Sequence, residues 1–288
     1  MNLTSINVHW LILFVHLTSD NMVETTQFLK RGWEILNRHG PVALASRSLT
    51  FVIDLIKDGY YGQLAKQNSP IDYHGVSLPL DMPIFDNHIR RAFVTGLYEA
   101  EEVELIDEYV TGQYDLIDLG ASTGFSTVYA LNRLDEKSRT VAVEANPEMI
   151  DVVRTVRELN DANLSIEHAA YQPSRSEVTF HVHGKTVSGS TKEQGEREIT
   201  VPAVSLTDLL SKYGIRDFVC LADIEGGEID LFRHDMDILE DRCALLVVEL
   251  HEIDGIAAES VQLLTDSAFE LVDNVGDVYV YRNESLHR

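Results

Sequence analysis

The sequence is poor in positive charge. Against 47 acidic side chains it has 23 basic ones, of which seven are lysines, and the formal net charge is −24. No basic cluster is dense enough to follow a phosphate backbone, so we expect no nucleic-acid partner. Such an acid excess keeps a protein soluble. We expect a halophilic protein, with an ordinary acidic cytosolic enzyme as the alternative.

Cysteines and long apolar runs are also scarce. The two cysteines, Cys220 and Cys243, lie in or beside apolar runs, where reduced thiols are commoner than bridges. The longest apolar run near the start, Trp10 to Val15, is too short to span a bilayer, and no basic segment precedes it. We therefore expect a cytoplasmic protein without stable membrane insertion. Residues 1–21 are almost free of acids, and we expect them to be a non-native or disordered extension before a true start at Met22.

The stretch from Tyr114 to Phe125 carries the clearest functional signal. A short apolar run ends at Gly120, and a helical pattern follows, as in nucleotide sites built from a strand, a glycine turn and a helix. We expect the glycines of this turn to let a ligand approach the backbone closely. Gly120 and Gly124 are separated by three residues, unlike the glycines in the Gly-x-Gly-x-x-Gly of dinucleotide sites. Asp118 would repel phosphate and favour an ammonium or sulfonium group. The pattern predicts S-adenosylmethionine as cofactor, with an ordinary βα turn or a nicotinamide-dependent dehydrogenase as alternatives.

Short apolar runs alternate with helical patterns through the rest of the chain. Consecutive βα units of this kind predict a parallel sheet whose ligand crevice lies at the carboxyl ends of the strands. We expect an α/β fold of the class I methyltransferase (Rossmann-like) type, with a seven-stranded, mostly parallel sheet, helices on both faces and an N-terminal helical extension. Residues 22–95 would form the helical accessory region and residues 96–288 the methyltransferase domain. The sheet strands are expected at 115–119, 140–143, 164–168, 218–224, 244–250, 269–275 and 278–282. We also expect one short strand over 75–78, an alternating strand over 177–182, a helix capped by Ser122 or Thr123 that runs to about Leu134, and a helix that starts at Asn146-Pro147.

Two further features bear on the crevice. Glu144 lies twenty residues after Gly124, at the tip of the second strand, where an acid can accept hydrogen bonds from both ribose hydroxyls. An exposed strand-end acid is the alternative. The polar stretch 184–198 is expected to be a long loop near the site, because such loops are often lids or substrate loops.

Several separated motifs resemble those of FkbM-type S-adenosylmethionine-dependent methyltransferases. The resemblance covers roughly residues 75–282. It departs at Ala222, where the family usually has a lysine. The motifs are Gly96-x-Tyr98-Glu99, Asp118-x-Gly120-Ala-x-x-Gly124, Glu144-Ala-Asn146-Pro147, Asp223-Ile-Glu225-Gly226-x-Glu228 and Glu249-x-His251.

The resemblance implies an enzyme that methylates hydroxyls, mostly on macrolides, sugars and other glycosylated or lipid acceptors. In this chain it implies that Asp118 lies near the amino group of the cofactor, Glu144 at the ribose and Ala169 at the adenine. Glu99 would close over the cofactor. The full set of implied cofactor-binding residues is Glu99, Asp118, Gly120, Ser122, Gly124, Glu144, Ala145, Asn146 and Ala169.

The candidate catalytic residues are two acids and a histidine at the ends of the fourth and fifth expected strands. We expect Asp223 or His251 to accept the proton of the hydroxyl and Glu225 to orient the acceptor, since a general base adds about 10²–10⁴-fold to such a reaction. Alternatively, these acids only shape a turn and a helix start. We assign no metal ligands, although Asp223, Glu225, Glu249 and His251 would suit a divalent cation if they converged.

The sequence also supports expectations about the protein's partners and about an alternative to catalysis. The acceptor would be a small molecule, a sugar or a glycan, and a homo-oligomer is compatible with the sequence. The replacement of the family's lysine by Ala222 also allows a non-catalytic module that binds S-adenosylmethionine without turning it over.

Overall fold

The computed structural model describes residues 53–182, 189–190, 197–252 and 255–286. The chain divides into two compact units, residues 1–59 and residues 60–288. In the first unit only residues 53–59 are described, and they are helical. The expected extension over 1–21 and the expected start at Met22 lie outside the described residues, and the expected boundary between residues 95 and 96 stays a prediction.

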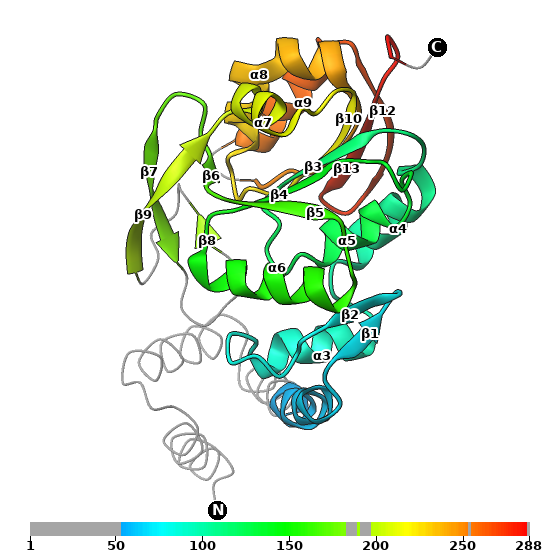
Figure 1. The fold of residues 1–288 in the computed structure, drawn as a ribbon, viewed down its shortest axis with the longest axis vertical. Helices are drawn as coiled ribbons and strands as arrows, with labels where there is room; N and C mark the ends of the chain where they lie inside the picture. Colours follow the sequence, from blue (N-terminus) through cyan, green and yellow to red (C-terminus); the bar gives the residue numbers. More distant parts are fainter. Residues whose placement is uncertain (1–52, 183–188, 191–196, 253–254, 287–288) are drawn as a thin grey trace, which may run out of the picture. The chain divides into compact units, whose positions relative to one another are not determined.

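The second unit is built on a seven-stranded sheet (Figure 1). The strands run in the order β12, β13, β11, β10, β3, β4 and β5. β13 is antiparallel to both neighbours, and the other pairs are parallel. The predicted fold class is therefore confirmed. The strands are β3 (Asp115–Leu119), β4 (Thr140–Glu144), β5 (Leu164–His168), β10 (Phe218–Ala222), β11 (Cys243–Glu249), β12 (Phe269–Val275) and β13 (Val278–Asn283).

The order of the strands reverses between β3 and β10. From β3 the chain moves outward through β4 to β5, whereas β10 returns to pair with the other side of β3. Ligands of parallel sheets bind beyond the carboxyl ends of the strands at such a reversal, because the following loops diverge there. The loops at Gly120 and Asp223 follow β3 and β10, so the sheet brings together two of the motifs found in the sequence.

Helices cover both faces of the sheet, as predicted (Figure 1). The side chains of β3 alternate between the two cores, with Leu116 on the first face and Ile117 and Leu119 on the second. The helix over 256–265 was not predicted. The first face carries α4 (Ala100–Tyr109), α5 (Phe125–Leu131) and α6 (Pro147–Leu159), and the second carries α7 (Leu206–Tyr213), α8 (Glu228–Arg242) and α9 (Ile256–Thr265).

A hairpin and a helix precede the sheet. β1 (Ile71–Tyr73) and β2 (Val76–Leu78) pair antiparallel where a single strand was expected, and α3 (Asn87–Thr95) follows. The hairpin is tied to the end of α6, because the amide of Ser77 donates to Asn160 Oδ1 (2.8 Å) and Asn160 Nδ2 donates to the Ser77 carbonyl (2.9 Å). Val76 and Leu78 are buried in the core of the first face.

The start of α5 differs from the prediction. Ser122 or Thr123 was expected to cap a helix running to Leu134, but Gly124 is the N-cap residue and the helix ends at Leu131. Thr123 Oγ1 accepts a hydrogen bond from the Phe125 amide (3.2 Å) just ahead of the helix. The amide of Ser122 is turned towards the tip of β4 instead, so this residue belongs to the loop.

A second, four-stranded sheet is formed by residues between β5 and α7. Its order is β6 (Ala170–Tyr171), β9 (Arg197–Val204), β7 (Glu177–Val182) and β8 (Gly189–Ser190). The loop expected over 184–198 is corrected in part, since β8 and the start of β9 lie within it. Residues 183–188 and 191–196 are outside the described part. The buried face of this sheet includes Phe180.

Two expectations from composition can be compared with the structure. Cys220 and Cys243 are buried and unbridged, as predicted. They lie on β10 and β11, where burial raises the pKa of both thiols. Among the described residues, no helix combines the length and the apolar character needed to cross a membrane.

Candidate functional site

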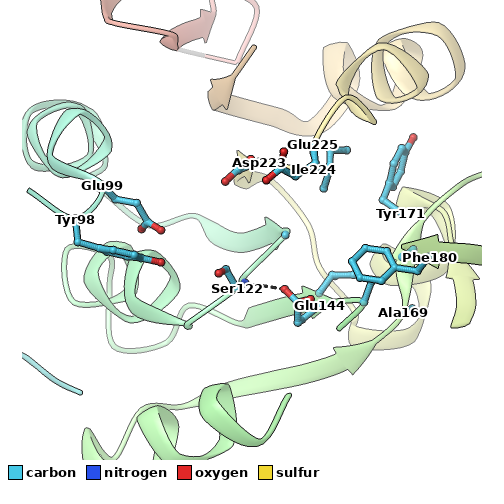
Figure 2. A pocket seen from close by; sticks show the side chains of 14 residues that line it. Tyr98, Glu99, Ser122, Glu144, Ala169, Tyr171, Phe180, Asp223, Ile224 and Glu225 are labelled. Carbon is cyan, nitrogen blue, oxygen red and sulfur yellow. Dashed lines mark hydrogen bonds between the residues drawn. The ribbon is translucent and has the colours of Figure 1, made fainter. Parts of the chain in front are cut away.

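A cleft opens at the carboxyl edge of the main sheet (Figure 2). Figure 2 shows Tyr98 and Glu99 on one side, Tyr171 and Phe180 on the opposite side, and Ser122 between them. Segments that are far apart in the sequence therefore converge here, as the strand order requires. Eight of the predicted site residues line the cleft: Glu99, Gly120, Ser122, Glu144, Ala145, Ala169, Asp223 and Glu225.

Three other predicted cofactor residues do not line the cleft. Asp118 is buried and accepts a hydrogen bond from the hydroxyl of Thr127 on α5. Burial raises the pKa of Asp118 to about 7. Its carboxyl is therefore partly protonated near neutral pH, which weakens the argument that its charge selects a sulfonium. Gly124 and Asn146 are the N-cap residues of α5 and α6.

Glu144 connects two loops of the cleft. Its Oε2 accepts a hydrogen bond from the Ser122 amide (2.7 Å), and its Oε1 accepts one from the Asn146 amide (2.6 Å). The residue is 7% exposed, and burial raises its pKa to about 7. A carboxylate has about four lone-pair sites, so acceptor capacity remains for ribose hydroxyls.

The glycines after β3 are explained by packing. Gly120 has a φ of 91°, and a β-carbon there would overlap the carbonyl oxygen of Asp223. Gly124 has a φ of 76°, and its β-carbon would lie 3.3 Å from the side chain of Val153 on α6. The sequence suggested that these glycines let a ligand approach the backbone. The structure shows instead that they let the loop pass close to β10 and α6.

Three side-chain-bearing residues of the cleft have unfavourable backbone conformations. Glu99, Ser122 and Glu225 have φ values of 46°, 46° and 50°. This left-handed region is costly for residues that carry a β-carbon. Such conformations persist where the surrounding structure imposes them, and they are concentrated at ligand sites. All three lie in loops that line the same cleft.

Glu99 shares a hydroxyl with a second acid. Ser126 Oγ lies 2.5 Å from Glu99 Oε2 and 2.6 Å from Glu102 Oε2. A hydroxyl has one proton to donate, so the second contact requires a protonated carboxyl. Burial raises the pKa of both Glu99 and Glu102, in agreement with a shared proton. A cation bound beside Glu99 would favour the fully ionised pair.

Four carboxylates surround His251 beside the same sheet edge. The hydrogen bond to Glu228 is the main cause that raises the pKa of His251 to about 9. Burial, followed by the charge of Glu249, raises the pKa of Asp223 well above its ordinary value. A protonated imidazole cannot accept a proton, so the raised pKa argues against His251 as the base while it keeps its proton. The donor atoms of Asp223, Glu249 and His251 lie within 4.8 Å of one another, a spacing suited to a metal ion.

A family model described as the methyltransferase FkbM domain matches residues 118–271, more than half of the chain. The chain belongs to this family. The resemblance drawn from the sequence motifs is therefore confirmed. The matched region contains the loops of Gly120, Glu144 and Asp223, whereas Glu99 lies before it.

Solved structures show a more distant likeness to this FkbM-family chain, and no curated protein matches it. A precorrin-6y C5,15-methyltransferase from Geobacter metallireducens is 15% identical, with 62% of this chain and 84% of that chain covered and a TM-score of 0.39. A putative O-methyltransferase from Klebsiella pneumoniae is 12% identical, with 65% and 78% covered and a TM-score of 0.38. Fibrillarin from Aeropyrum pernix, with natively bound S-adenosyl-L-methionine, is 12% identical, with 60% and 67% covered and a TM-score of 0.36.

Two aromatic residues of the FkbM-family cleft were missed in the sequence. Tyr171 on β6 and Phe180 on β7 line it on the side of Ala169 (Figure 2). The Tyr171 hydroxyl donates to Asp235 Oδ2 on α8 (2.8 Å), which anchors this side of the cleft. The alternating pattern of 177–182 indicated a strand. It did not indicate that the strand folds over the cleft.

Proposed function

We propose that this FkbM-family protein is an S-adenosylmethionine-dependent methyltransferase that acts on a hydroxyl of a sugar, a glycan or another small molecule. The observation that carries the proposal is the convergence of three loops, at Gly120, Glu144 and Asp223, on one cleft at the reversal point of the sheet. Such a site is where open α/β sheets bind nucleotide-type cofactors.

The donor set of the cleft fits this cofactor, which supplies its methyl group from a sulfonium centre. Glu144 would hold the ribose hydroxyls with the lone pairs that its backbone contacts leave available. Glu99 and Ser122 would hold the amino-acid part, where a carboxylate complements an ammonium group. Phe180 and Ala169 would provide an apolar wall for the adenine, since aromatic side chains stack on base rings.

The acceptor would lie on the side of β10. Asp223 Oδ1 is buried and has no hydrogen-bond partner among the described residues, so it has an acceptor site available for a hydroxyl proton. Glu225 lines the same part of the cleft and would orient the acceptor. Placing the acceptor in line with the methyl group matters most, because alignment alone can contribute about 7–11 kcal/mol.

The proposal can be tested in two stages with the full chain. Calorimetric titration with S-adenosylmethionine and S-adenosylhomocysteine should show binding that is strongly weakened in Glu144→Ala. The exposed Glu148→Ala on α6 serves as the charge-matched control. Labelled methyl transfer should then be assayed on panels of sugars, glycans, lipids and RNA. Absence of cofactor binding by the folded parent would refute the proposal, and binding without transfer would favour the non-catalytic module.

A further inference from the structure

Three of the four carboxylates around His251 stand at distances that are too long for hydrogen bonds. From Nε2, the oxygens of Asp223, Glu225 and Glu249 lie at 3.7, 3.5 and 3.6 Å. Hydrogen bonds from nitrogen to oxygen are usually 2.7–3.2 Å. Neighbouring ligands held about 2.1–2.2 Å from one metal ion are about 3.0–3.6 Å apart, over the range from octahedral to tetrahedral angles. The spacing therefore resembles that of ligand atoms around a common centre.

Glu228 completes the arrangement from behind. Its side chain is 0% exposed, and its Oε1 lies 3.1 Å from His251 Nδ1. Its other oxygen, Oε2, is buried without a hydrogen-bond partner among the described residues. A buried carboxylate on the far nitrogen of a histidine is a common outer-shell feature of metal sites, because it fixes which nitrogen faces the ion. Here it would leave Nε2 directed at the three other acids.

The group also has an excess of negative charge and a route to solvent. Four carboxylates face one imidazole. Asp223 Oδ1, one of the three oxygens near Nε2, receives no hydrogen bond from any described residue. The side chains of Asp223 and Glu249 are 40% and 39% exposed, so an ion can reach them from solvent.

We propose that Asp223, Glu249 and His251 bind a divalent cation, with Glu228 as the residue that orients His251. Carboxylate oxygens with one imidazole suit Mn²⁺ and related ions. The site does not require S-adenosylmethionine, and it stands independently of the proposed reaction. If that reaction occurs, the cation would lie on the acceptor side and would lower the pKa of a bound hydroxyl, as such ions do for water. Asp223 would then act as a ligand rather than as the base.

The test uses the full chain, freed of metal with a chelator and titrated with Mn²⁺ while the free ion is followed by electron paramagnetic resonance. About 1 M NaCl should be present, because a Debye length of about 3 Å screens the many surface acids. We expect uptake of one equivalent by the parent. Affinity should fall by at least about tenfold in His251→Ala and Glu249→Gln, and by about 10–100-fold in Glu228→Gln.

Glu270→Gln on β12 removes one exposed carboxylate away from the cluster and should leave the affinity unchanged. Circular dichroism of each variant separates loss of the site from loss of the fold. No stoichiometric uptake, or uptake that the cluster variants and Glu270→Gln affect equally, would overturn the proposal. S-adenosylmethionine binding by the same metal-free protein tests the proposed function separately.

Discussion

A β-carbon on Gly120 would overlap the carbonyl oxygen of Asp223, so the loops after β3 and β10 can approach only because residue 120 has no side chain. We expect Gly120→Ala to destabilise the protein by about 1–3 kcal/mol from overpacking, in addition to about 1–2 kcal/mol from its left-handed backbone. Urea unfolding measures this loss.

Gly75→Ala is the matched control for that experiment. Gly75 has a φ of 82° in the β1–β2 hairpin, and a β-carbon there would meet no heavy atom of the described residues within 4 Å, apart from its chain neighbours. Gly75→Ala should therefore destabilise the protein only by the backbone cost of about 1–2 kcal/mol. Equal losses in the two variants would show that contact with Asp223 does not constrain residue 120.

Glu144→Gln should weaken cofactor binding by about tenfold or more. An amide has one oxygen, so it can satisfy the Ser122 amide or the Asn146 amide but not both. Leaving one of these two amide donors buried without a partner costs about 1–3 kcal/mol. The ordered loop would be destabilised by this amount. Calorimetric titration with S-adenosylmethionine measures the effect. Glu177→Gln, an exposed change of the same type on β7, should bind normally, and unchanged affinity in Glu144→Gln would contradict the role given to this carboxylate.

Stability should fall as the pH rises from about 4 to about 7. The pKa values of Asp118 and Glu144 are raised by burial from 3.8 and 4.5 to about 7. In this window the folded protein keeps protons that the unfolded chain has released, so each group lowers the unfolding free energy by up to about 1.4 kcal/mol per pH unit. Above the folded pKa the contribution becomes constant.

Asp118→Asn isolates one of these two groups. The amide can still accept the hydrogen bond from Thr127 but does not titrate. Urea unfolding between about pH 5 and about pH 8 should therefore show a shallower pH dependence in the variant than in the parent. An identical slope would mean that Asp118 ionises normally in the folded protein.

Phe180→Ala should reduce affinity for S-adenosylmethionine, because stacking of a base on an aromatic ring is worth about 1–3 kcal/mol. Val178→Ala is the control, since Val178 belongs to the same buried cluster on β7 but does not line the cleft. Both variants should lose some stability. Only Phe180→Ala should lose affinity for the adenosyl group, and equal binding by the two would place the adenine elsewhere.

Much of the fold was predictable because buried parallel strands leave short apolar runs in the sequence. The run 115–119 and the Asn146-Pro147 helix start coincide with β3 and α6. The cap of α5 was mispredicted, since local preference at Ser122 is overridden by a long-range hydrogen bond from its amide to Glu144.

The site was predictable where a motif follows a strand, and less so where distant segments meet. Glu144 and Asp223 could be placed from the strand ends. The contact of Glu228 with His251 depends on how the start of α8 lies beside the end of β11, and the wall formed by Phe180 depends on the second sheet. Neither arrangement has a local sequence signal, because both arise from tertiary packing.

The hairpin that Asn160 ties to α6 has a practical consequence for truncation. The family-matched region, 118–271, omits this hairpin, together with α4, Glu99 and β13. β13 lies between β11 and β12, so its removal would split the sheet, and loss of the hairpin and α4 would expose one of its two cores. A shortened form for crystallisation or spectroscopy should therefore retain the whole second unit, from residue 60 through at least residue 283.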